Sequence, residues 1–429
     1  MTDSSPTARS STARVIGAGV IGNLLEWYDF AIYGFFAAQI GRAFFPAEDK
    51  VAQVLAAFGI FAIGYVMRPL GGVVTGYIGD RLGRRVALTF SVAAMAIPTF
   101  LVGVLPGYQT LGVMAPVLLT VLRIIQGLSV GGEYTTAMVF LVERAPPGRR
   151  GLIGAVCSCG ASAGIVLGSA TGAALAAMVS AEALSEWAWR LPFILGLFVG
   201  LAGFVLRRGI EEAPVNTDGQ PPLLTTVPGE LPLLLRLVGL SVFLAVGFYL
   251  MFLYVVTWLQ TADGIAPKHA LEVNTLSILA LMPTCLFTGW LSDRIGRRMT
   301  MLIAMAGAIL GSLPLFWLLH HQSNAMILAG QFGFVLIVGL YAGALPAALV
   351  EAAPHRGRCT VVAIGYNIPL GIIGGLTPMA ATWLVARTGD DLSPAYMLIA
   401  AAVVSTVALL FMQETFRQRF QTGAEPVPA

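Results

Sequence analysis

Long apolar runs recur along this chain from residue 16 to residue 413, and short polar stretches separate them. Each run holds about 20 residues or more, which is enough for a helix to cross a hydrocarbon layer about 30 Å thick. Only 11% of the residues are charged and 57% are hydrophobic, whereas roughly a quarter of the residues of a soluble domain are charged. The pattern predicts an all-α membrane protein.

The apolar runs divide into twelve predicted transmembrane helices. Their ranges are 16–39, 52–78, 86–106, 113–141, 151–179, 190–207, 236–260, 272–291, 299–319, 325–350, 359–386 and 395–413. The polar residues 1–14 lack the short apolar core and the small-residue cleavage site of a signal peptide, so no cleaved leader is expected.

The basic residues between these helices favour one orientation in the membrane. With a cytoplasmic N-terminus, the inner loops and tails hold Arg9, Arg14, Arg81, Arg84, Arg85, Arg144, Arg149, Arg150, Arg207, Arg208, Arg236, Arg294, Arg297, Arg298, Arg356, Arg358, Arg417 and Arg419. The outer loops hold only Arg42, Lys50, Arg190, Lys268 and Arg387. Because basic loops resist translocation, the bias predicts that both termini are cytoplasmic, in agreement with an even number of helices.

Two motifs occur twice. The stretch GYIGDRLGRR at 76–85 returns as GWLSDRIGRR at 289–298, and VERAPPGRR at 142–150 returns as VEAAPHRGR at 350–358. The similar offsets predict two six-helix bundles in parallel orientation, related by pseudo-symmetry. The predicted parts are an N-terminal tail (1–15), a first bundle (16–208), a cytoplasmic linker (209–235), a second bundle (236–414) and a C-terminal tail (415–429).

Five ionisable residues lie deep within predicted helices of the first bundle: Glu26, Asp29, Arg68, Arg123 and Glu133. A charge at a helix centre costs roughly 2.5–3.5 kcal/mol, so such residues normally face a partner or a water-filled cavity. They are either functional or mutually neutralising buried ion pairs, and Arg68 could be wholly structural. The second bundle offers polar and aromatic side chains instead: Tyr249, Tyr254, Trp258, Gln331, Tyr341, Tyr366 and Asn367.

Helical spacing groups these charges into stripes. At about 100° per residue, Arg123, Gln126 and Glu133 fall within an arc of about 80°, so one face presents a cation, an amide and a carboxylate. Glu26 and Asp29 share a face of the first helix with Tyr33 nearby. Since a guanidinium matches a carboxylate, we expect Arg123 to bind an anionic substrate. Substrate-binding candidates are Arg123, Gln126, Tyr33, Tyr249, Tyr254, Trp258, Tyr341 and Asn367.

Other chemistry is not indicated by the sequence. Cys157, Cys159, Cys285 and Cys359 have no metal-ligand partners at useful spacing. No nucleophile–base pair or phosphate-binding loop is present, so we expect no enzyme activity, metal or cofactor. The expected partners are a small organic anion as substrate, protons and the lipid bilayer, with no nucleic acid and no obligatory protein partner.

The doubled motif, together with twelve spans and a central loop, resembles the major facilitator superfamily. Five further motifs are similar to its metabolite:proton symporter family of bacterial inner membranes: GNLLEWYDF (22–30), RPLGG (68–72), RIIQGLSVGGEYT (123–135), WAWRLPF (187–193) and GGLTPMAATWLV (374–385). That family includes carriers of citrate, dicarboxylates, shikimate and proline/betaine. The resemblance implies a multi-pass protein of the inner membrane.

The resemblance also implies roles for residues. Asp80 and Arg81 are expected to help latch the cytoplasmic face when the carrier is open outward. The expected gate comprises Gly76, Asp80, Arg81, Gly83, Arg84, Arg85, Gly289, Asp293, Arg294, Gly296, Arg297 and Arg298. The fifth span carries Gly160, Gly164, Gly168 and Gly172 but not the Gly-Pro motif of the family's antiporters, which favours symport. The four glycines form one stripe on which another helix can pack closely.

These features favour a proton-coupled symporter that imports a small mono-, di- or tricarboxylate by alternating access. Glu26, Asp29 or Glu133 would carry the proton. One alternative is proton-coupled uptake of a zwitterionic osmolyte such as proline or betaine. The chain ends soon after Gln413 without the coiled-coil extension of the proline/betaine carrier, so we expect no osmosensing role. A non-transporting sensor or a passive facilitator on the same fold is the other alternative.

Overall fold

The computed structural model describes residues 12–46, 50–207, 230–265, 267–321, 323–355 and 357–416. Within these ranges all the regular secondary structure is helical, and no strand is present. Most of the predicted N-terminal tail, C-terminal tail and linker lies outside them. The membrane-spanning all-α fold predicted from the sequence is therefore confirmed.

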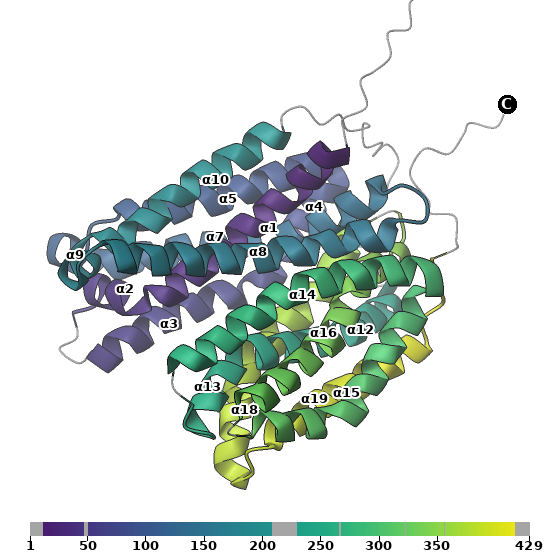
Figure 1. Cartoon of the computed structure of the whole chain (residues 1–429). Coiled ribbons are helices and arrows are strands. Elements are labelled where there is room, and N and C mark those ends of the chain that lie inside the picture. The colour runs from purple at the N-terminus through teal and green to yellow at the C-terminus, as the bar shows by residue number, and fades with distance from the viewer. Residues whose placement is uncertain are drawn as a thin grey trace, which may run out of the picture.

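The first bundle, coloured purple to teal in Figure 1, is formed by the helices before the linker. Its elements are α1 (Thr12–Phe35), α2 (Ala37–Phe44), α3 (Lys50–Val66), α4 (Arg68–Arg81), α5 (Arg84–Val104), α6 (Tyr108–Leu111), α7 (Met114–Arg144), α8 (Arg150–Met178), α9 (Ala181–Glu186), η1 (Ala188–Arg190) and α10 (Leu191–Arg207).

The second bundle, coloured teal-green to yellow, lies beside the first (Figure 1). Its elements are α12 (Leu231–Tyr249), η3 (Leu250–Tyr254), α13 (Val255–Thr261), α14 (Pro267–Ile295), α15 (Arg297–Leu319), α16 (Asn324–Ala352), α17 (Arg358–Ile368), η4 (Pro369–Gly374), α18 (Gly375–Thr388) and α19 (Ser393–Leu410). The bundles meet where α8 packs on α14 and α16, and where α4 packs on α17.

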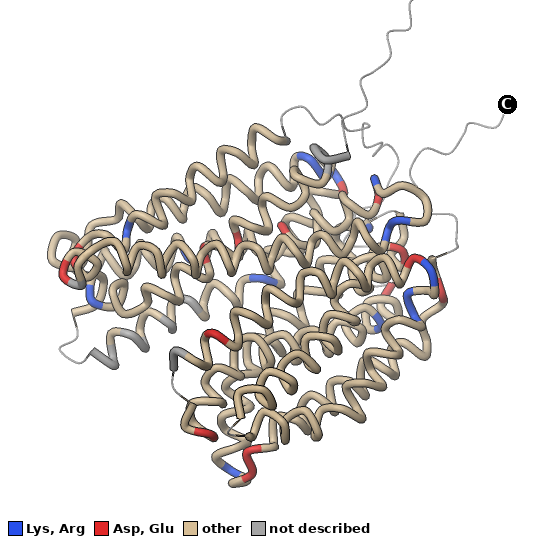
Figure 2. The backbone as a smooth tube through the Cα atoms, in the orientation of Figure 1, with Lys and Arg blue, Asp and Glu red and all other residues tan. Residues whose placement is uncertain are grey.

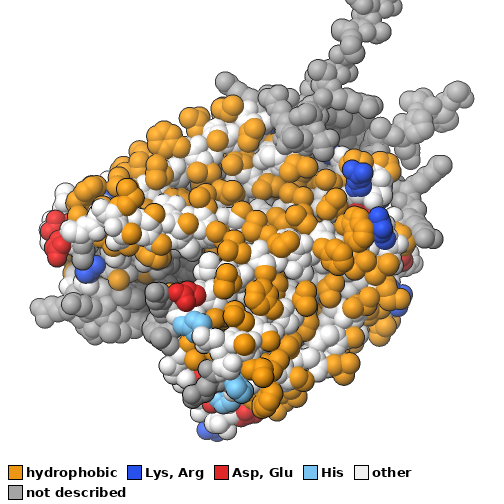
Figure 3. Space-filling view, in the orientation of Figure 1, with side chains coloured by type: hydrophobic (Ala, Val, Ile, Leu, Met, Phe, Trp, Pro, Cys, Tyr) orange, Lys and Arg blue, Asp and Glu red, His pale blue; other side chains and the backbone are white. Residues whose placement is uncertain are grey.

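Ten helices in the described ranges are long and apolar enough to cross a membrane. The 24-residue α1, and α3 followed by α4, run alongside them (Figure 1), which fits the twelve predicted spans. The visible surface is mostly apolar between the two ends (Figure 3). Large side chains such as Met178, Phe198 and Leu310 are 81%, 63% and 77% exposed, as expected where the solvent is lipid.

Several predicted spans are interrupted. Residues 52–78 break at Met67, between α3 and α4, because Pro69 lacks the N–H that a continuous helix requires. The spans 236–260 and 359–386 each contain a π-helical turn, η3 and η4, and the second begins at Pro369. The second bundle also begins before the predicted 236, since α12 starts at Leu231 and takes the last residues of the predicted linker.

The glycine stripe of α8 packs against α1. A Cβ atom on Gly160 would lie 2.6 Å from Val20 Cγ1, and one on Gly168 would lie 2.9 Å from the Tyr28 carbonyl oxygen. Only hydrogen at these positions lets the two backbones approach so closely. This close packing fixes the position of α1, which carries Glu26 and Asp29, relative to α8.

Candidate functional site

Charged residues gather at the end of the molecule that the sequence predicts to be cytoplasmic (Figure 2). At the end of α4, Asp80 accepts hydrogen bonds from the N–H groups of Cys359 (3.1 Å) and Thr360 (2.8 Å) and from the Thr360 hydroxyl (2.8 Å). A carboxylate of the first bundle thus caps α17 of the second. In mirror fashion, Asp293 of α14 caps the start of α8 through two N–H groups, at 2.8 and 2.9 Å.

Two glutamates extend this cytoplasmic network. Glu143, at the end of α7, contacts Arg84 of its own bundle (3.2 Å) and Arg358 of the other bundle (2.8 Å). Arg84 also donates to the Gly79 carbonyl oxygen at 2.8 Å. Since Glu143 joins arginines from both bundles, its contacts hold the two bundles together at this end.

Glu351, at the end of α16, is the counterpart in the second bundle. It contacts Arg297 of its own bundle (3.0 Å) and Arg150 of the other bundle (3.6 Å). Sequence reasoning did not assign a role to Glu143, Arg150, Glu351 or Arg358. The signal was present, because the repeat of VERAPPGRR as VEAAPHRGR carries these residues at matching positions.

The motif glycines allow the bundles to approach. A Cβ atom on Gly76 would lie 2.8 Å from Thr360 Cα, and one on Gly289 would lie 2.5 Å from the Gly151 carbonyl oxygen. The later glycines, Gly83 and Gly296, turn the chain with φ of 99° and 103°, a region that other residues rarely adopt.

The remaining motif arginines correct one expectation. Arg81 and Arg294 stack on aromatic rings of their own helices at 5.8 and 4.0 Å, and the arginine three residues further on in each motif makes the ion pairs of the network instead. Arg85 and Arg298 are half-buried, and the Arg298 N–H donates to Glu414 at 3.0 Å. Helix periodicity explains why Arg84 and Arg297 make these ion pairs, because their guanidinium groups follow the turn and point back toward the bundle interface.

Deep in the first bundle, Asp29 is the centre of a closed hydrogen-bonded group. Its carboxylate accepts from Arg123 Nη1 (2.5 Å), Thr99 Oγ1 (2.8 Å) and Gln126 Nε2 (3.0 Å). The Arg123 guanidinium lies 3.7 Å from the ring centroid of Tyr33, a favourable cation–π contact. This Asp29 cluster joins α1, α5 and α7, all of the first bundle.

Arg68 and Glu26 form a second, looser pair. Their closest atoms, Nη2 and Oε1, are 3.8 Å apart, and both side chains are 1% exposed. Both carboxylate oxygens of Glu26, and Nε and Nη1 of Arg68, are buried with no hydrogen-bond partner among the described residues. Arg123 Nε and Nη2 share that condition, but Arg123 already has a carboxylate at contact distance. Buried polar atoms of this kind mark a place for water or a ligand.

Glu133 completes the acidic set at the far end of the stripe predicted with Arg123 and Gln126. It is 2% exposed and lies close enough to Glu26 for the two charges to interact. Arg123 and Glu133 are ten residues apart, about 15 Å along α7. The stripe therefore runs past two groups of partners at different depths, the Asp29 cluster and the Arg68–Glu26 pair.

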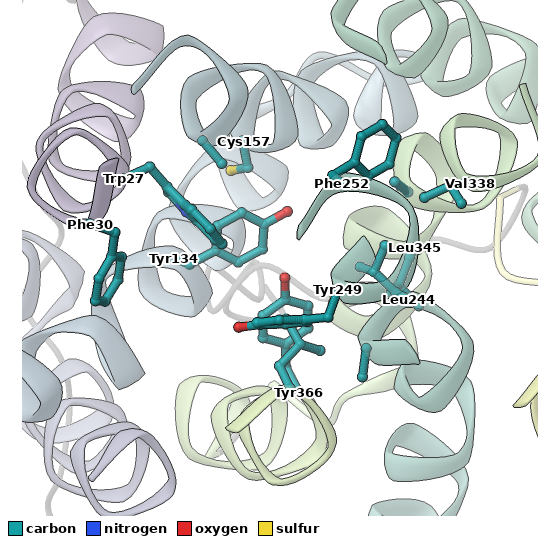
Figure 4. Close-up of a cluster of buried hydrophobic side chains, with 14 of the residues drawn as sticks. Trp27, Phe30, Tyr134, Cys157, Leu244, Tyr249, Phe252, Val338, Leu345 and Tyr366 are labelled. Carbon is teal, nitrogen blue, oxygen red and sulfur yellow. The ribbon is translucent and has the colours of Figure 1, made fainter. Parts of the chain in front are cut away.

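Aromatic rings from the two bundles meet beside this pair. We call Trp27, Tyr65, Tyr134, Phe248, Tyr249 and Tyr366 the aromatic layer. The facing pairs are Trp27 with Phe248, Tyr65 with Tyr249, and Tyr134 with Tyr366, with ring centroids 5.5, 6.0 and 4.9 Å apart. In Figure 4, Trp27, Tyr134, Tyr249 and Tyr366 approach one central region from opposite sides. Arg68 lies 5.4 Å from the Tyr65 ring centroid.

The helix interruptions gather at the same place. Arg68 is the first residue of α4 after the break at Met67, Tyr249 is the last residue before η3, and Tyr366 lies three residues before η4. π-Helical turns are frequent at functional sites, and transporters build substrate sites from discontinuous helices.

The second-bundle candidates divide into two groups. Tyr249 belongs to the aromatic layer, and Asn367 donates across the interface to the Gly131 carbonyl oxygen. Three others are not brought to this region. Tyr341 donates to Leu240 (2.5 Å), Trp258 donates to Asp391 (2.8 Å), and Tyr254 closes η3 on the far side of that turn. We therefore remove Tyr341, Trp258 and Tyr254 from the substrate-binding set, because helix rotation directs them into their own bundle or toward its end.

The end opposite the cytoplasmic network differs in shape. The visible surface is hollowed there between the two bundles (Figure 3). With the cytoplasmic network intact and the aromatic layer in contact, the arrangement corresponds to a carrier closed on the predicted cytoplasmic side.

Comparison with known proteins agrees with this geometry. Residues 19–368 match the family model of the Major Facilitator Superfamily. A putative proline/betaine transporter of Staphylococcus aureus is 35% identical over 98% of this chain and 92% of its own length. The glycine betaine/proline/ectoine/pipecolic acid transporter OusA of Dickeya dadantii is 34% identical over 96% and 85%, and the proline/betaine transporter of Escherichia coli is 33% identical over the same shares.

Solved structures share the fold at low sequence identity. The proton:xylose symporter XylE bound to 6-bromo-6-deoxy-D-glucose aligns with a TM-score of 0.78 at 18% identity, over 95% of this chain and 97% of XylE. FucP in the outward conformation aligns with a TM-score of 0.68 at 15% identity, over 94% and 100%.

Proposed function

Since the chain belongs to the major facilitator superfamily and is thus a multi-pass transporter of the bacterial inner membrane rather than an enzyme, we propose that it imports a small zwitterionic osmolyte, such as proline or betaine, together with protons. This choice replaces the organic anion as the leading substrate class.

The relatives and the site both support a zwitterion. The relatives at 33–35% identity carry names that specify proline and betaine. The observation that carries the proposal is a buried cation and a buried anion, Arg68 and Glu26, beside aromatic rings from both bundles. A carboxylate pairs with a guanidinium, and a substituted ammonium group favours carboxylates and aromatic faces.

Proton coupling is assigned to the buried carboxylates of the first bundle. Asp29 is held by Arg123 inside a single bundle, so protonation would release a buried ion pair without involving the substrate directly. Glu26 and Glu133 lie closer to the aromatic layer. These two carboxylates give this region a place for one proton.

Alternating access follows from the two ends of the molecule. In the proposed cycle, Asp80 and Asp293 leave the helix starts that they cap, and the arginine–glutamate pairs between bundles separate. The opposite end closes as the bundles rock around the central region. Loss of the cytoplasmic contacts is offset by substrate and proton binding at the centre.

Uptake by proteoliposomes tests the proposal. Radiolabelled proline and betaine should accumulate above equilibrium when the outside is made acidic, and a protonophore should abolish the accumulation. Monocarboxylates, dicarboxylates and tricarboxylates serve as matched competitors. Accumulation of a carboxylate but of neither zwitterion would restore the anion hypothesis, and equilibration without accumulation would indicate a facilitator.

A further inference from the structure

The Arg68–Glu26 pair differs from the other deep ion pair in what surrounds it. Asp29 and Arg123 touch at hydrogen-bond distance, and Thr99 and Gln126 satisfy the carboxylate further. Arg68 and Glu26 stay 3.8 Å apart, beyond hydrogen-bond length. Both carboxylate oxygens of Glu26, and Nε and Nη1 of Arg68, lack a hydrogen-bond partner among the described residues. Buried charged groups with unsatisfied polar atoms are costly, so the geometry is favourable only if another group completes it.

The Arg68–Glu26 pair also faces the interface between the two bundles, which move against each other in the proposed cycle. The Cβ atom that Gly371 of η4 would carry lies 3.5 Å from Arg68 Cβ, so the second bundle passes directly over this residue. The hydroxyl groups of Tyr249 and Tyr366 are near enough to interact electrostatically with the guanidinium. A ligand between Arg68 and Glu26 would therefore touch both bundles, whereas the Asp29 cluster contacts only the first.

We propose, resting on the function proposed above, that the substrate inserts between Arg68 and Glu26, with its carboxylate on Arg68 and its ammonium group between Glu26 and the aromatic layer. Insertion of the substrate replaces the loose ion pair by two ion pairs. One joins the substrate carboxylate to Arg68, and the other joins the substrate ammonium group to Glu26. The net charge of the site does not change, and no buried charge is left alone.

The same charge balance explains selectivity. A simple anion would pair with Arg68 and leave Glu26 unpaired, and a simple cation would do the reverse. An uncompensated buried charge costs several kcal/mol. Trp27 Nε1 and the Tyr249 hydroxyl, which are buried without a hydrogen-bond partner among the described residues, provide donors toward the substrate carboxylate.

Glu133 enters the balance as a second carboxylate near Glu26. One proton on this acidic pair leaves a single negative charge opposite Arg68. If Glu26 is neutralised by mutation, Glu133 can supply the negative charge opposite Arg68 in its place. The test therefore includes a variant in which Glu133 is neutralised as well.

The experiment uses three probes of similar shape on the purified full-length protein. Betaine is the zwitterion, 3,3-dimethylbutanoate is its anionic isostere, and choline carries the same trimethylammonium group as a cation. Calorimetry of the wild type should show betaine binding at least about tenfold more tightly than either of the others, as loss of a charge-assisted contact implies.

Charge removal should then shift the preference in opposite directions. In Glu26→Gln, alone and with Glu133→Gln, affinity for 3,3-dimethylbutanoate relative to betaine should rise by about tenfold or more. In Arg68→Gln, affinity for choline relative to betaine should rise similarly. The two variants serve as controls for each other, because general damage to the protein would weaken all three probes together.

Three results would overturn the assignment. They are a wild type that binds 3,3-dimethylbutanoate or choline as tightly as betaine, variants at Arg68 and Glu26 that keep the wild-type preference, and a preference that shifts in Arg123→Gln instead. Should a variant fail to fold, the comparison of the three probes on the wild type stands by itself as the test. If the wild type binds neither proline nor betaine, the proposed function fails as well.

Discussion

Arg68 and Arg123 are both fully buried arginines of the first bundle, yet their guanidinium groups have different neighbours. Arg123 has a carboxylate at 2.5 Å and an aromatic ring beneath it. Arg68 has a carboxylate at 3.8 Å and an interface with the second bundle. We therefore propose a coupling role for Arg123 and a substrate role for Arg68.

For the Asp29 cluster, Asp29→Asn should preserve exchange of substrate across the membrane and abolish accumulation. The amide keeps the shape of the carboxylate but cannot take up a proton. Counterflow and gradient-driven uptake in the same vesicles measure the two activities. An Asp29→Asn protein that still accumulates substrate would place the proton on Glu26 or Glu133.

Neutralising Asp80 should open the cytoplasmic end. An amide lacks the negative charge that interacts favourably with the start of α17, an interaction of about 0.3–2 kcal/mol, which corresponds to roughly 2–30-fold in the closed–open equilibrium. Cys359 reports on this, because it is 1% exposed beneath the cap. In a protein whose other cysteines are replaced by Ala, N-ethylmaleimide should label Cys359 faster in Asp80→Asn.

Glu182→Gln provides the matched control, since Glu182 is an exposed acid on α9. Its labelling rate should equal that of the parent protein. Equal rates in Asp80→Asn and the parent would contradict a latching role for Asp80.

At the residue scale, the sequence located the deep charges but not their partners. Any ionisable residue inside an apolar run stands out by composition, so all five were found. Which carboxylate meets Arg68 or Arg123 depends on the rotation of α1 against α4 and α7, which periodicity within a single helix does not determine. The roles of Glu143 and Glu351 were not predicted because both residues lie at helix ends, where a charged residue does not stand out in the sequence.

At the element scale, the glycines of the doubled motif set how closely the bundles approach. Gly76 lies against α17 and Gly289 against α8, each without room for a methyl group. The π turns η3 and η4 and the break at Met67 were not predicted. Hydropathy stays high through these interruptions, so composition does not reveal them, although Pro69 and Pro369 were local signals.

Gly76→Ala should therefore hinder closure of the cytoplasmic end and slow transport. The added Cβ atom would meet backbone at 2.8 Å, which a side-chain rotation cannot relieve. Initial uptake rates and Cys359 labelling measure the effect. Gly34→Ala is the control, because a Cβ atom there meets no atom of the described residues within 4 Å. Wild-type rates in Gly76→Ala would show that this contact does not limit the cycle.

At the scale of the whole molecule, most of the fold followed from hydropathy. The predicted span 299–319 became α15 at Arg297–Leu319, and 325–350 became α16 at Asn324–Ala352. The contrast between apolar runs and charged loops is large enough to place such boundaries within a few residues. The substrate class was less accessible to sequence reasoning, because Arg123 alone suggested an anion and the pairing of Arg68 with Glu26 appears only when α4 and α1 are brought together in the first bundle.

Charge movement tests the central claim of proton-coupled zwitterion transport most directly. A zwitterion carries no net charge, so its symport with protons moves positive charge inward, whereas a monocarboxylate with one proton moves none. In proteoliposomes on a solid-supported membrane, adding proline or betaine should produce an inward positive current that grows as the outside is acidified. Zwitterion uptake without any current would contradict the account.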